Sequence, residues 1–371
     1  SRFGYQVMAR NLLYAQSGGV TAVINASAAG VIATAREAGG RIGRVLAARN
    51  GILGVLREAL VDTADISADD LARLRCTPGG AFGSCRFDLD PEERNPAQYD
   101  RLFAVLAAHD IGFFLYNGGN GSMETCRQIQ AAARDRGYPL TVVGVPKTID
   151  NDIEGTERSF GFDTAVATVT DALERVQTTG QSHGRVMIVE TMGRYAGWIA
   201  LESGLAGAAD VILLPEIGYD VQQIAKVCRS RAARRRSTLI CIAEGAKPAG
   251  GSLTVERTIA DSPDPIRLGG VAHVLREQLQ PLVQAEVRAT VLGHVQRGGS
   301  PTPFDRVLAT QYGNAAAHLL QNRDYHRMVA LQRGELSSVA LSEVAGKNRL
   351  VPADHPLLVC AREIGVCLGD D

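Results

Sequence analysis

The sequence predicts an α/β fold built of mostly parallel sheets with helices on both faces. Short apolar runs alternate with helical patterns along the chain, and this alternation is typical of parallel, helix-flanked sheets. Some runs, such as residues 186–189, are apolar at every position, as expected of strands buried on both faces. The 371 residues provide enough chain for two or three core-forming units.

Each predicted strand ends in a glycine-rich or polar turn, and a predicted helix follows three of these turns. The predicted strands cover residues 12–15, 111–116, 141–145, 185–190 and 238–243. The predicted helices cover residues 21–37, 123–136 and 163–178. Because ligands of open α/β sheets bind beyond the carboxyl ends of strands, we expect functional residues in these turns.

The composition excludes several classes of function. Hydrophobic residues make up 45% of the chain and charged residues 21%, which fits a globular soluble protein. The net charge of −1 argues against broad nucleic-acid binding, and no apolar run reaches the roughly 18 residues that span a bilayer. The seven cysteines lack metal-finger spacing, so we expect reduced thiols in a cytoplasmic protein. Neither a nucleic acid nor a membrane is expected as a partner.

Two glycine-rich turns stand between a strand and a helix, at residues 17–19 and 118–122. Glycine lets a ligand approach the backbone, and the following helix offers free amides and a positive dipole end, a combination that binds phosphate. Glycine also serves such corners for geometry alone. Neither turn is a P-loop, since no Gly-Lys-Ser/Thr follows, and the second lacks the third glycine of a dinucleotide fingerprint.

The segment Lys147-Thr148-Ile149-Asp150-Asn151-Asp152 follows a buried strand directly. Its two carboxylates stand where a base and an electrostatic partner could act on a bound substrate. An isolated Asp-Asn-Asp is otherwise more often a turn in which side chains bond their own backbone. Five arginines beside strand ends and glycine loops favour an anion site over scattered surface charge: Arg86, Arg185, Arg194, Arg288 and Arg297.

Taken in order, these motifs resemble the phosphofructokinase family, whose 6-phosphofructokinase members have two doubly wound, mostly parallel three-layer α/β/α domains. The resemblance rests on residues 18–19, 79–84, 118–122, 146–152, 192–194 and 288–300, and extends from Gly18 to about Asp305. Pro-Lys-Thr-Ile-Asp-Asn-Asp and Gly-His-Val-Gln-Arg-Gly-Gly-Ser are its most specific parts.

The resemblance implies phosphoryl transfer to the 1-hydroxyl of fructose 6-phosphate, giving fructose 1,6-bisphosphate in glycolysis. Asp150 would be the general base, and Thr148 and Asp152 would position the hydroxyl and the magnesium-bound phosphate. Phosphoryl transfer is mainly positioning and charge neutralisation, so one base, a metal, amides and arginines suffice.

The resemblance also implies roles for the remaining site residues. Sugar binding would fall to Met192, Gly193, Arg194 and Glu244, with Arg194 counted among the catalytic groups as well. The 6-phosphate would be held by His294 and Arg297, with Arg185 and Arg288 supplied by a neighbouring subunit. The phosphoryl donor would face Gly18, Arg86, Gly119, Asn120, Gly121, Ser122 and Lys147.

The donor itself is either ATP or inorganic pyrophosphate. Pyrophosphate users of the family typically carry Asp at the position of Gly121, where it fills the space of the α-phosphate of ATP and repels its charge. Glycine leaves room for a nucleotide, and we therefore expect ATP. Lys147 and the opening at residues 15–25 are similar to the pyrophosphate-using branch, so pyrophosphate stays the alternative.

Magnesium is the expected cofactor, with Asn120 and Asp150 as its protein ligands. Many ATP users carry Asp in place of Asn120, and an amide oxygen is a poorer ligand for a hard cation than a carboxylate. The arginines of a known bacterial effector site are replaced by Ala28 and Ile32, so we do not expect that site.

By resemblance the domains are discontinuous. Residues 1–161 plus 296–346 would form the donor-binding domain, and residues 162–295 plus 347–371 the fructose 6-phosphate-binding domain. The sugar site would lie between them and be completed by a second copy of the chain, which implies a homodimer or homotetramer.

Two rival functions come from other classes. A non-catalytic paralogue would bind sugar phosphate as a regulatory subunit, which the substitution at Asn120 keeps open. A lipid or nicotinamide-nucleotide kinase shares the Gly-Asn-Gly turn but is not expected to carry Met-Gly-Arg and Gly-His-Val-Gln-Arg.

Overall fold

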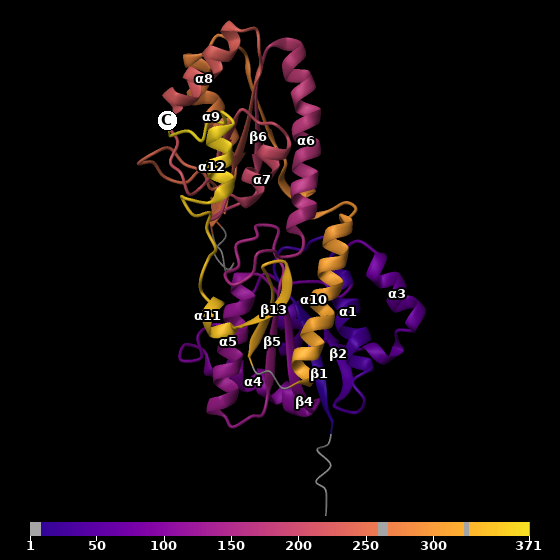
Figure 1. Cartoon of the computed structure of the whole chain (residues 1–371). Helices are drawn as coiled ribbons and strands as arrows, with labels where there is room; N and C mark the ends of the chain where they lie inside the picture. Colours follow the sequence, from indigo (N-terminus) through magenta and orange to yellow (C-terminus); the bar gives the residue numbers. More distant parts are fainter. Residues whose placement is uncertain (1–8, 259–265, 323–325, 371) are drawn as a thin grey trace, which may run out of the picture. The chain divides into compact units, whose positions relative to one another are not determined.

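The computed structural model describes residues 9–258, 266–322 and 326–370 (Figure 1). The first eight residues of the predicted donor-binding domain and residue 371 lie outside this part. All seven cysteines are free thiols. The contacts divide the chain into two units, and each is described by itself.

The first unit comprises Ser1–Thr148, Ile153–Gly161 and Pro303–Lys347, and the second comprises Ile149–Asp152, Phe162–Thr302 and Asn348–Asp371. Two segments and the single residue Lys347, which lies in the first unit, therefore fall outside the domains predicted for them. Residues 149–152 pack with the second unit because Ile149 is buried in its core. Residues 296–302 also belong to the second unit. The Thr302 hydroxyl donates a hydrogen bond to the Asp163 carboxylate, and the Thr302 amide donates one to the Thr164 hydroxyl.

The first unit holds a seven-stranded sheet whose five central strands are parallel. The order is β13-β12-β5-β4-β1-β2-β3, and only the edge strands β13 and β3 pair antiparallel. The strands are β1 (Arg10–Gln16), β2 (Ile42–Ala48), β3 (Leu60–Asp62), β4 (Ile111–Gly118), β5 (Thr141–Pro146), β12 (Arg327–Gln332) and β13 (Glu335–Ala340).

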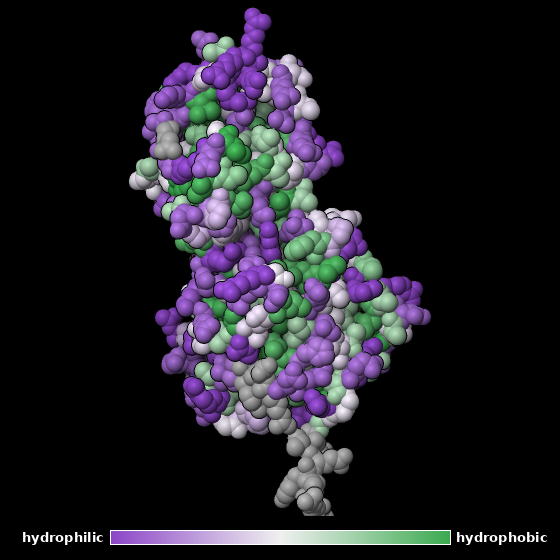
Figure 2. Space-filling model, in the orientation of Figure 1, coloured by the Kyte–Doolittle hydropathy of each residue, from purple (hydrophilic) through white to green (hydrophobic). Residues whose placement is uncertain are grey.

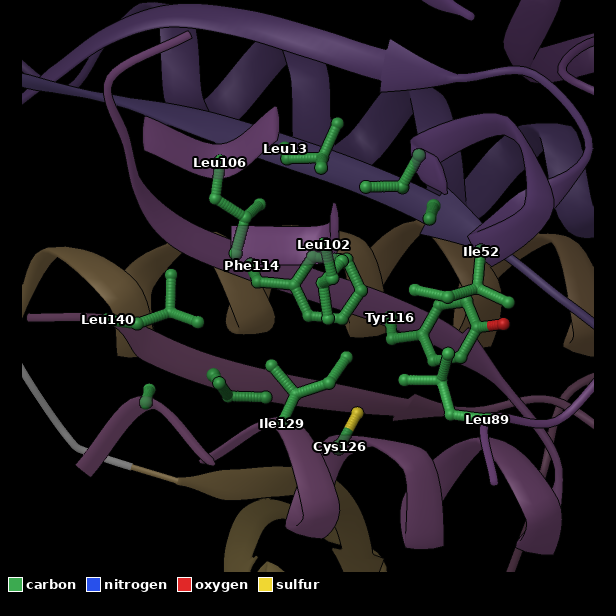
Figure 3. Close-up of a cluster of buried hydrophobic side chains, with 14 of the residues drawn as sticks. Leu13, Ile52, Leu89, Leu102, Leu106, Phe114, Tyr116, Cys126, Ile129 and Leu140 are labelled. Carbon is green, nitrogen blue, oxygen red and sulfur yellow. The ribbon is translucent and has the colours of Figure 1, made fainter. Parts of the chain in front are cut away.

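Helices cover both faces of this sheet because the central strands are apolar on both sides. Along β1, Leu13 faces one hydrophobic cluster and Leu12 the other. Figure 3 shows the cluster formed with α4 and α5. The helices of the unit are α1 (Ile24–Arg36), α2 (Gly51–Leu56), α3 (Ala68–Cys76), α4 (Pro96–Ala108), α5 (Asn120–Asp135), α10 (Pro303–Gln321) and α11 (Leu341–Val344).

Two helices of the first unit, α1 and α10, cross at close range because glycines face each other's backbone. A Cβ added at Gly30 would lie 2.6 Å from the Thr310 carbonyl oxygen, and one at Gly313 would lie 2.2 Å from that of Ser27. Ala28 and Ile32 of α1 are fully buried. This stretch of α1 therefore serves packing.

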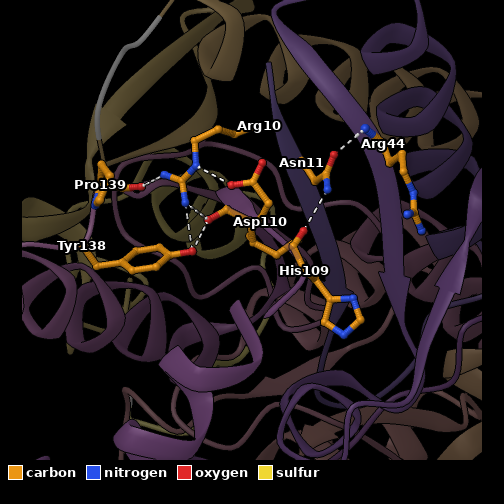
Figure 4. Close-up of polar contacts among 8 residues, drawn as sticks. Arg10, Asn11, Arg44, His109, Asp110, Tyr138 and Pro139 are labelled. Carbon is orange, nitrogen blue, oxygen red and sulfur yellow. Dashed lines mark hydrogen bonds and ion pairs between the residues drawn. The ribbon is translucent and has the colours of Figure 1, made fainter. Parts of the chain in front are cut away.

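Polar contacts hold the amino-terminal edge of the seven-stranded sheet, opposite the edge at which the glycine turns lie (Figure 4). The Arg10 guanidinium donates to the Ile111 carbonyl at 2.7 Å, to the Tyr138 hydroxyl at 3.0 Å and to Asp110 at 3.3 Å. These bonds connect the starts of β1 and β4.

Arg10→Ala is expected to lower stability without altering catalysis. Loss of these hydrogen bonds should reduce the free energy of unfolding by about 1–3 kcal/mol, as measured by urea denaturation. The KM for fructose 6-phosphate, the substrate that the resemblance implies, should stay unchanged, because Arg10 lies at the far edge of the sheet. A changed KM with unchanged stability would contradict this assignment.

The second unit holds a four-stranded, all-parallel sheet of order β11-β6-β8-β7 and a separate β9-β10 hairpin. The strands are β6 (Val186–Thr191), β7 (Val211–Leu213), β8 (Thr238–Ala243), β9 (Val255–Thr258), β10 (Ile266–Leu268) and β11 (Val287–Val291). Its helices are α6 (Phe162–His183), α7 (Trp198–Ala206), α8 (Val221–Ala233), α9 (Val271–Leu279) and α12 (Pro356–Glu363).

Successive residues of β6 face different cores in the second unit. Met187 and Val189 pack with α6, α7 and α12, whereas Val186 and Ile188 pack with α8 and α9. Both units are thus three-layer α/β/α structures, and the predicted fold class is confirmed. Hydrophilic residues are spread over both units on the face shown in Figure 2. Within the described residues, no helix combines the length and apolarity required to cross a bilayer.

Candidate active site

The two glycine turns and the loop before Arg86 meet in the first unit. β1 and β4 are parallel neighbours, so their carboxyl ends align, and the Ser17 amide donates to the Asn117 carbonyl at 2.9 Å. The Gly18 amide donates to the Cys85 carbonyl at 2.9 Å, and Ser84 Oγ donates to the Gly18 carbonyl at 2.7 Å. These bonds bring the predicted donor-binding residues of three separate segments together.

Lys147 is buried beneath the first glycine turn. The residue is 2% exposed, and its Nζ donates a hydrogen bond to the Gly19 carbonyl at 2.6 Å. Gly18 has φ +80°, and a Cβ there would stand 3.1 Å from Nζ. A glycine at residue 18 is therefore required both by backbone conformation and by the ammonium group, which places a positive charge directly under the turn.

Helix α5 begins at the second turn, with Gly119 at the N-cap and no side chain capping the helix. The N-terminus of the helix and its dipole favour negative charge at this turn. Gly118 must lack a side chain, since a Cβ would stand 2.0 Å from Ser122 Oγ. Asn120 and Gly121 are the first two residues of the helix.

One carboxylate of this region was not singled out from the sequence. A Cβ added at Gly121 would lie 3.2 Å and 3.3 Å from the two carboxylate oxygens of Asp88. The Asp88 residue is exposed, but its carboxyl group lies among protein atoms of the turn, and this partial desolvation raises its pKa. No sequence motif marks Asp88, because it reaches Gly121 from a loop some thirty residues earlier in the chain.

In the second unit, Arg349 holds the segment that carries Asp150 and Asp152. The Arg349 amide donates to the Asp152 carbonyl at 2.8 Å, and its guanidinium donates to the Asn151 carbonyl at 2.8 Å. The guanidinium also stacks 4.3 Å from the centre of the Trp198 ring. Asn151 adopts φ +54°, a conformation that asparagine tolerates. Arg349 is a positioning residue that the sequence analysis missed.

The predicted sugar-binding residues follow three adjacent strands of the second unit. Met192, Gly193 and Arg194 follow β6, and Glu244 follows β8. A 3₁₀ turn, η3 (Gly293–Arg297), follows β11 and carries His294 and Arg297. Because these strands are parallel neighbours in the order β11-β6-β8, their following residues share one edge of the sheet.

Gln296 connects two of these segments. Its side-chain oxygen accepts a hydrogen bond from the Met192 amide at 3.1 Å, and its amide nitrogen donates to the Gly293 carbonyl at 2.9 Å. On the other side, the Glu244 amide donates to the Thr191 carbonyl at 2.8 Å and the Gly245 amide to the Gly193 carbonyl at 3.1 Å. Gln296 is 1% exposed, so it fixes the turns from within. The sequence analysis did not assign it a role.

The pKa of the Glu244 carboxyl group is strongly raised. Burial raises its pKa to about 8, and the neighbouring charges of Asp150 and Glu190 raise it further. The Gly193 amide and the Arg297 guanidinium oppose this shift. Asp150 and Arg297 therefore both act electrostatically on Glu244. Nε of Arg297 is buried and has no hydrogen-bond partner within the described residues, so it retains a donor for an anionic ligand.

The stability of the protein should depend on the ionisation of Glu244. The folded-state pKa of about 8 lies above the ordinary value of 4.5, so the folded state retains a proton that the unfolded state loses. Stability therefore falls as pH rises from about 4.5 to 8. We expect Glu244→Gln to match the wild-type melting temperature near pH 4, to exceed it slightly at pH 6 and to exceed it most at pH 9. The exposed Glu335→Gln is the matched control, and parallel melting profiles of Glu244→Gln and wild type would contradict the assignment.

Glu190 contributes a second buried carboxylate, at 2% exposure. Its two oxygens accept hydrogen bonds from the Gly270 amide at 3.1 Å and the Ala272 amide at 2.9 Å, at the start of α9. It therefore serves as the cap of that helix. This role is structural, and sequence reasoning did not identify it, because the residue lies eighty positions before the helix.

Arg185 and Arg288 lie at the opposite edge of the four-stranded sheet. Arg185 precedes β6 and Arg288 is the second residue of β11, and both pair with Glu286 at 2.8 Å and 2.5 Å. The hydrogen bond from Arg185 holds the pKa of Glu286 below its usual range. A strand rises about 3.3 Å per residue, so the length of β6 separates Arg185 from Met192. The structure does not bring these two arginines to the other sugar-site residues of their own chain.

The expected magnesium ligands are one amide and one carboxylate side chain, Asn120 and Asp150. Within the described residues, no group of three or more His, Cys, Asp or Glu side chains is arranged to hold a metal ion. Asn120 belongs to the first unit and Asp150 to the second. This sparse oxygen set fits Mg²⁺ that arrives with phosphate ligands, because Mg²⁺ is commonly bound through one or two protein oxygens plus substrate phosphates.

Comparisons with known proteins agree with these motifs. The family model for phosphofructokinase matches residues 11–320. The chain is 41% identical to the ATP-dependent 6-phosphofructokinase of Chloroflexus aurantiacus over 360 residues, 96% of each chain. It is 41% identical to the pyrophosphate–fructose 6-phosphate 1-phosphotransferase of Xanthomonas campestris over 352 residues, 92% of this chain and 78% of that protein.

Solved structures give the same result. The pyrophosphate-dependent phosphofructokinase of Nitrosospira multiformis superimposes with a TM-score of 0.81 at 33% identity, covering 98% of this chain and 93% of that one. The corresponding enzyme of Marinobacter aquaeolei gives a TM-score of 0.79 at 33% identity, covering 97% and 92%. Relatives of both donor classes occur at similar identity, so similarity alone does not decide the donor. The chain belongs to the phosphofructokinase family.

Proposed function

We propose that the protein transfers a phosphoryl group from ATP to the 1-hydroxyl of fructose 6-phosphate, giving fructose 1,6-bisphosphate. The observation that carries this proposal is the electrostatic group of Asp150, Glu244 and Arg297 at one edge of the four-stranded sheet. A carboxylate beside a buried carboxyl and a cation is suited to take a hydroxyl proton from a sugar whose phosphate is held nearby.

Asp150 accepts the proton of the 1-hydroxyl as the oxygen attacks the donor's terminal phosphorus. Asp150 needs little tuning for this step if the proton moves late in a loose transition state. Thr148 and Asp152 orient the hydroxyl, and Met192, Gly193 and Arg194 hold the sugar. Glu244, neutral below about pH 8, can donate a hydrogen bond to a sugar hydroxyl without adding negative charge near the incoming phosphate.

The 6-phosphate is assigned to His294 and Arg297, and the donor to the amides of α5, Arg86 and Lys147. Lys147 and Asp150 are three residues apart, so their Cα atoms are at most about 11 Å apart along the chain. Mg²⁺, held by Asn120, Asp150 and donor oxygens, would neutralise phosphate charge. In this proposal, cations and amides would surround the transferred group, as phosphoryl transfer requires.

ATP is the preferred donor in this proposal because Gly121 leaves space beside the N-terminus of α5. Pyrophosphate is the second candidate, favoured by the buried Lys147 ammonium and by the Asp88 carboxylate next to Gly121. Because the relatives include both ATP-dependent and pyrophosphate-dependent enzymes, the deciding experiment compares both donors.

A second copy of the chain is part of the proposal. Arg185 and Arg288 lie at the far edge of the sheet from their own sugar site, and both carry charge at the surface, paired with Glu286. Such arginines can reach the 6-phosphate of a neighbouring subunit, giving a homodimer or homotetramer. The free thiols fit a reducing compartment, the cytoplasm.

The deciding experiment measures formation of fructose 1,6-bisphosphate with Mg²⁺ and either ATP or pyrophosphate, using aldolase-coupled detection. Faster turnover with ATP supports the proposal, and faster turnover with pyrophosphate replaces it with the second candidate. Binding of fructose 6-phosphate without turnover on either donor would indicate the regulatory paralogue. Binding of NAD or diacylglycerol without sugar phosphate would indicate the other kinase class.

A further inference from the structure

Asp88 lies beside the start of helix α5, and its placement has a consequence for the donor. Its two carboxylate oxygens stand 3.2 Å and 3.3 Å from the position that a Cβ of Gly121 would take. An aspartate at residue 121 itself would place its carboxylate oxygens about 2.4 Å from that Cβ, given ordinary bond lengths, so the Asp88 oxygens lie only about 1 Å farther from it. Asp88 therefore brings a negative charge close to the place that a side chain at position 121 would occupy.

The surroundings of this carboxylate favour an anion. The N-cap residue of α5 is Gly119, which has no side chain to cap the helix, and a helix N-terminus attracts negative charge. The proposed donor phosphates compete for the amides of this N-terminus. Two anions cannot share them without mutual repulsion, which amounts to about 1 kcal/mol at 4 Å in water and more where water is displaced.

We propose that Asp88 is a specificity-determining residue of the donor site, which supplies from another loop the negative charge that Gly121 lacks and thereby disfavours ATP relative to pyrophosphate. This inference rests on the proposed function, in which the α-phosphate of ATP lies next to Gly121. Pyrophosphate has no phosphate beyond the two that the transfer itself requires, so it does not approach Asp88 in the same way. Donor preference then depends on residues 88 and 121 as a pair.

The test compares Asp88→Asn with wild type using each donor. Neutralising the carboxylate should raise the ratio of kcat/KM for ATP to kcat/KM for pyrophosphate about five- to tenfold. Equilibrium binding of Mg-ATP and Mg-pyrophosphate by calorimetry should show the same change, so the test does not depend on turnover. The increase should shrink at 0.5 M salt, because charges near the surface are screened.

Two further variants separate charge from shape and from general effects on the loop. Asp88→Glu keeps the charge and should leave the donor ratio near the wild-type value. Asp90→Asn removes a carboxylate from the same loop, where it accepts a hydrogen bond from Asn95 at 3.1 Å, and should also leave the ratio unchanged.

Two results would overturn the inference. An unchanged ratio in Asp88→Asn would show that the carboxylate does not act on the donor. A lower ratio would show that it assists ATP, for example by accepting hydrogen bonds from ribose hydroxyls. Either result is independent of which donor wild type prefers, so this inference and the proposed function can fail separately.

Discussion

Asp150→Asn is expected to lower kcat by about 10²–10⁴-fold, the range typical of a lost general base. The variant keeps the shape of the side chain, and Arg349 still holds the backbone of the neighbouring Asn151 and Asp152. The KM for fructose 6-phosphate should therefore change little. Steady-state kinetics with saturating donor measures both quantities. Asp90→Asn, a carboxylate of the first unit outside the site, is the matched control and should keep the wild-type rate.

The same variant has a second readout that a merely structural role would not produce. The charge of Asp150 raises the pKa of Glu244, so its removal should lower the pKa of Glu244 below about 8. The pH at which fructose 6-phosphate binding changes should move downward in Asp150→Asn. Wild-type turnover in Asp150→Asn would remove Asp150 from the mechanism. An unmoved pH profile of fructose 6-phosphate binding would contradict the electrostatic coupling of Asp150 to Glu244.

Gly121→Asp is expected to abolish most activity with ATP. The new side chain takes the space of the nucleotide, and its Cβ already stands 3.2 Å from an Asp88 carboxylate oxygen. Two carboxylates this close repel each other, and one of them should be protonated near neutral pH. We expect kcat/KM for ATP to fall about 100-fold or more, corresponding to at least 2.7 kcal/mol.

The double variant Asp88→Asn/Gly121→Asp removes that conflict. It should keep the loss of ATP activity while regaining turnover with pyrophosphate relative to Gly121→Asp alone. The four proteins form a double-mutant cycle, whose coupling energy should clearly differ from zero because the two side chains are in contact. Additive effects in the cycle, or an unchanged donor preference in Gly121→Asp, would contradict the role given to Gly121.

The sequence was sufficient for the fold class because its signals are local. Apolar runs such as residues 141–145 and 186–189 became fully buried parallel strands, and the glycines at 18 and 118 occupy positions where a side chain would collide. The predicted helix at 163–178 extends to His183 and passes through Gly180, where a Cβ would stand 2.6 Å from the Met187 side chain. Packing against Met187 thus overrides the low helix propensity of glycine.

The residues that the sequence did not reveal act across long separations in the chain. Asp88 reaches Gly121, Gln296 reaches Met192, and Arg349 reaches Asn151. None lies in a motif whose spacing predicts its partner, because each contact depends on how strands are ordered in the sheet. Such supporting residues become visible only when the strand order is known.

Arg349 also bears on how the protein is made. The segment that carries the proposed base is anchored by a residue about two hundred positions later, through contacts with Asn151 and Asp152. During synthesis the nascent chain can therefore complete the glycine turns long before the ribosome has translated the anchor. A chain released before residue 349 would lack the hydrogen bonds that hold the segment of the proposed base, so we expect this segment to be fixed only after residue 349 has been translated.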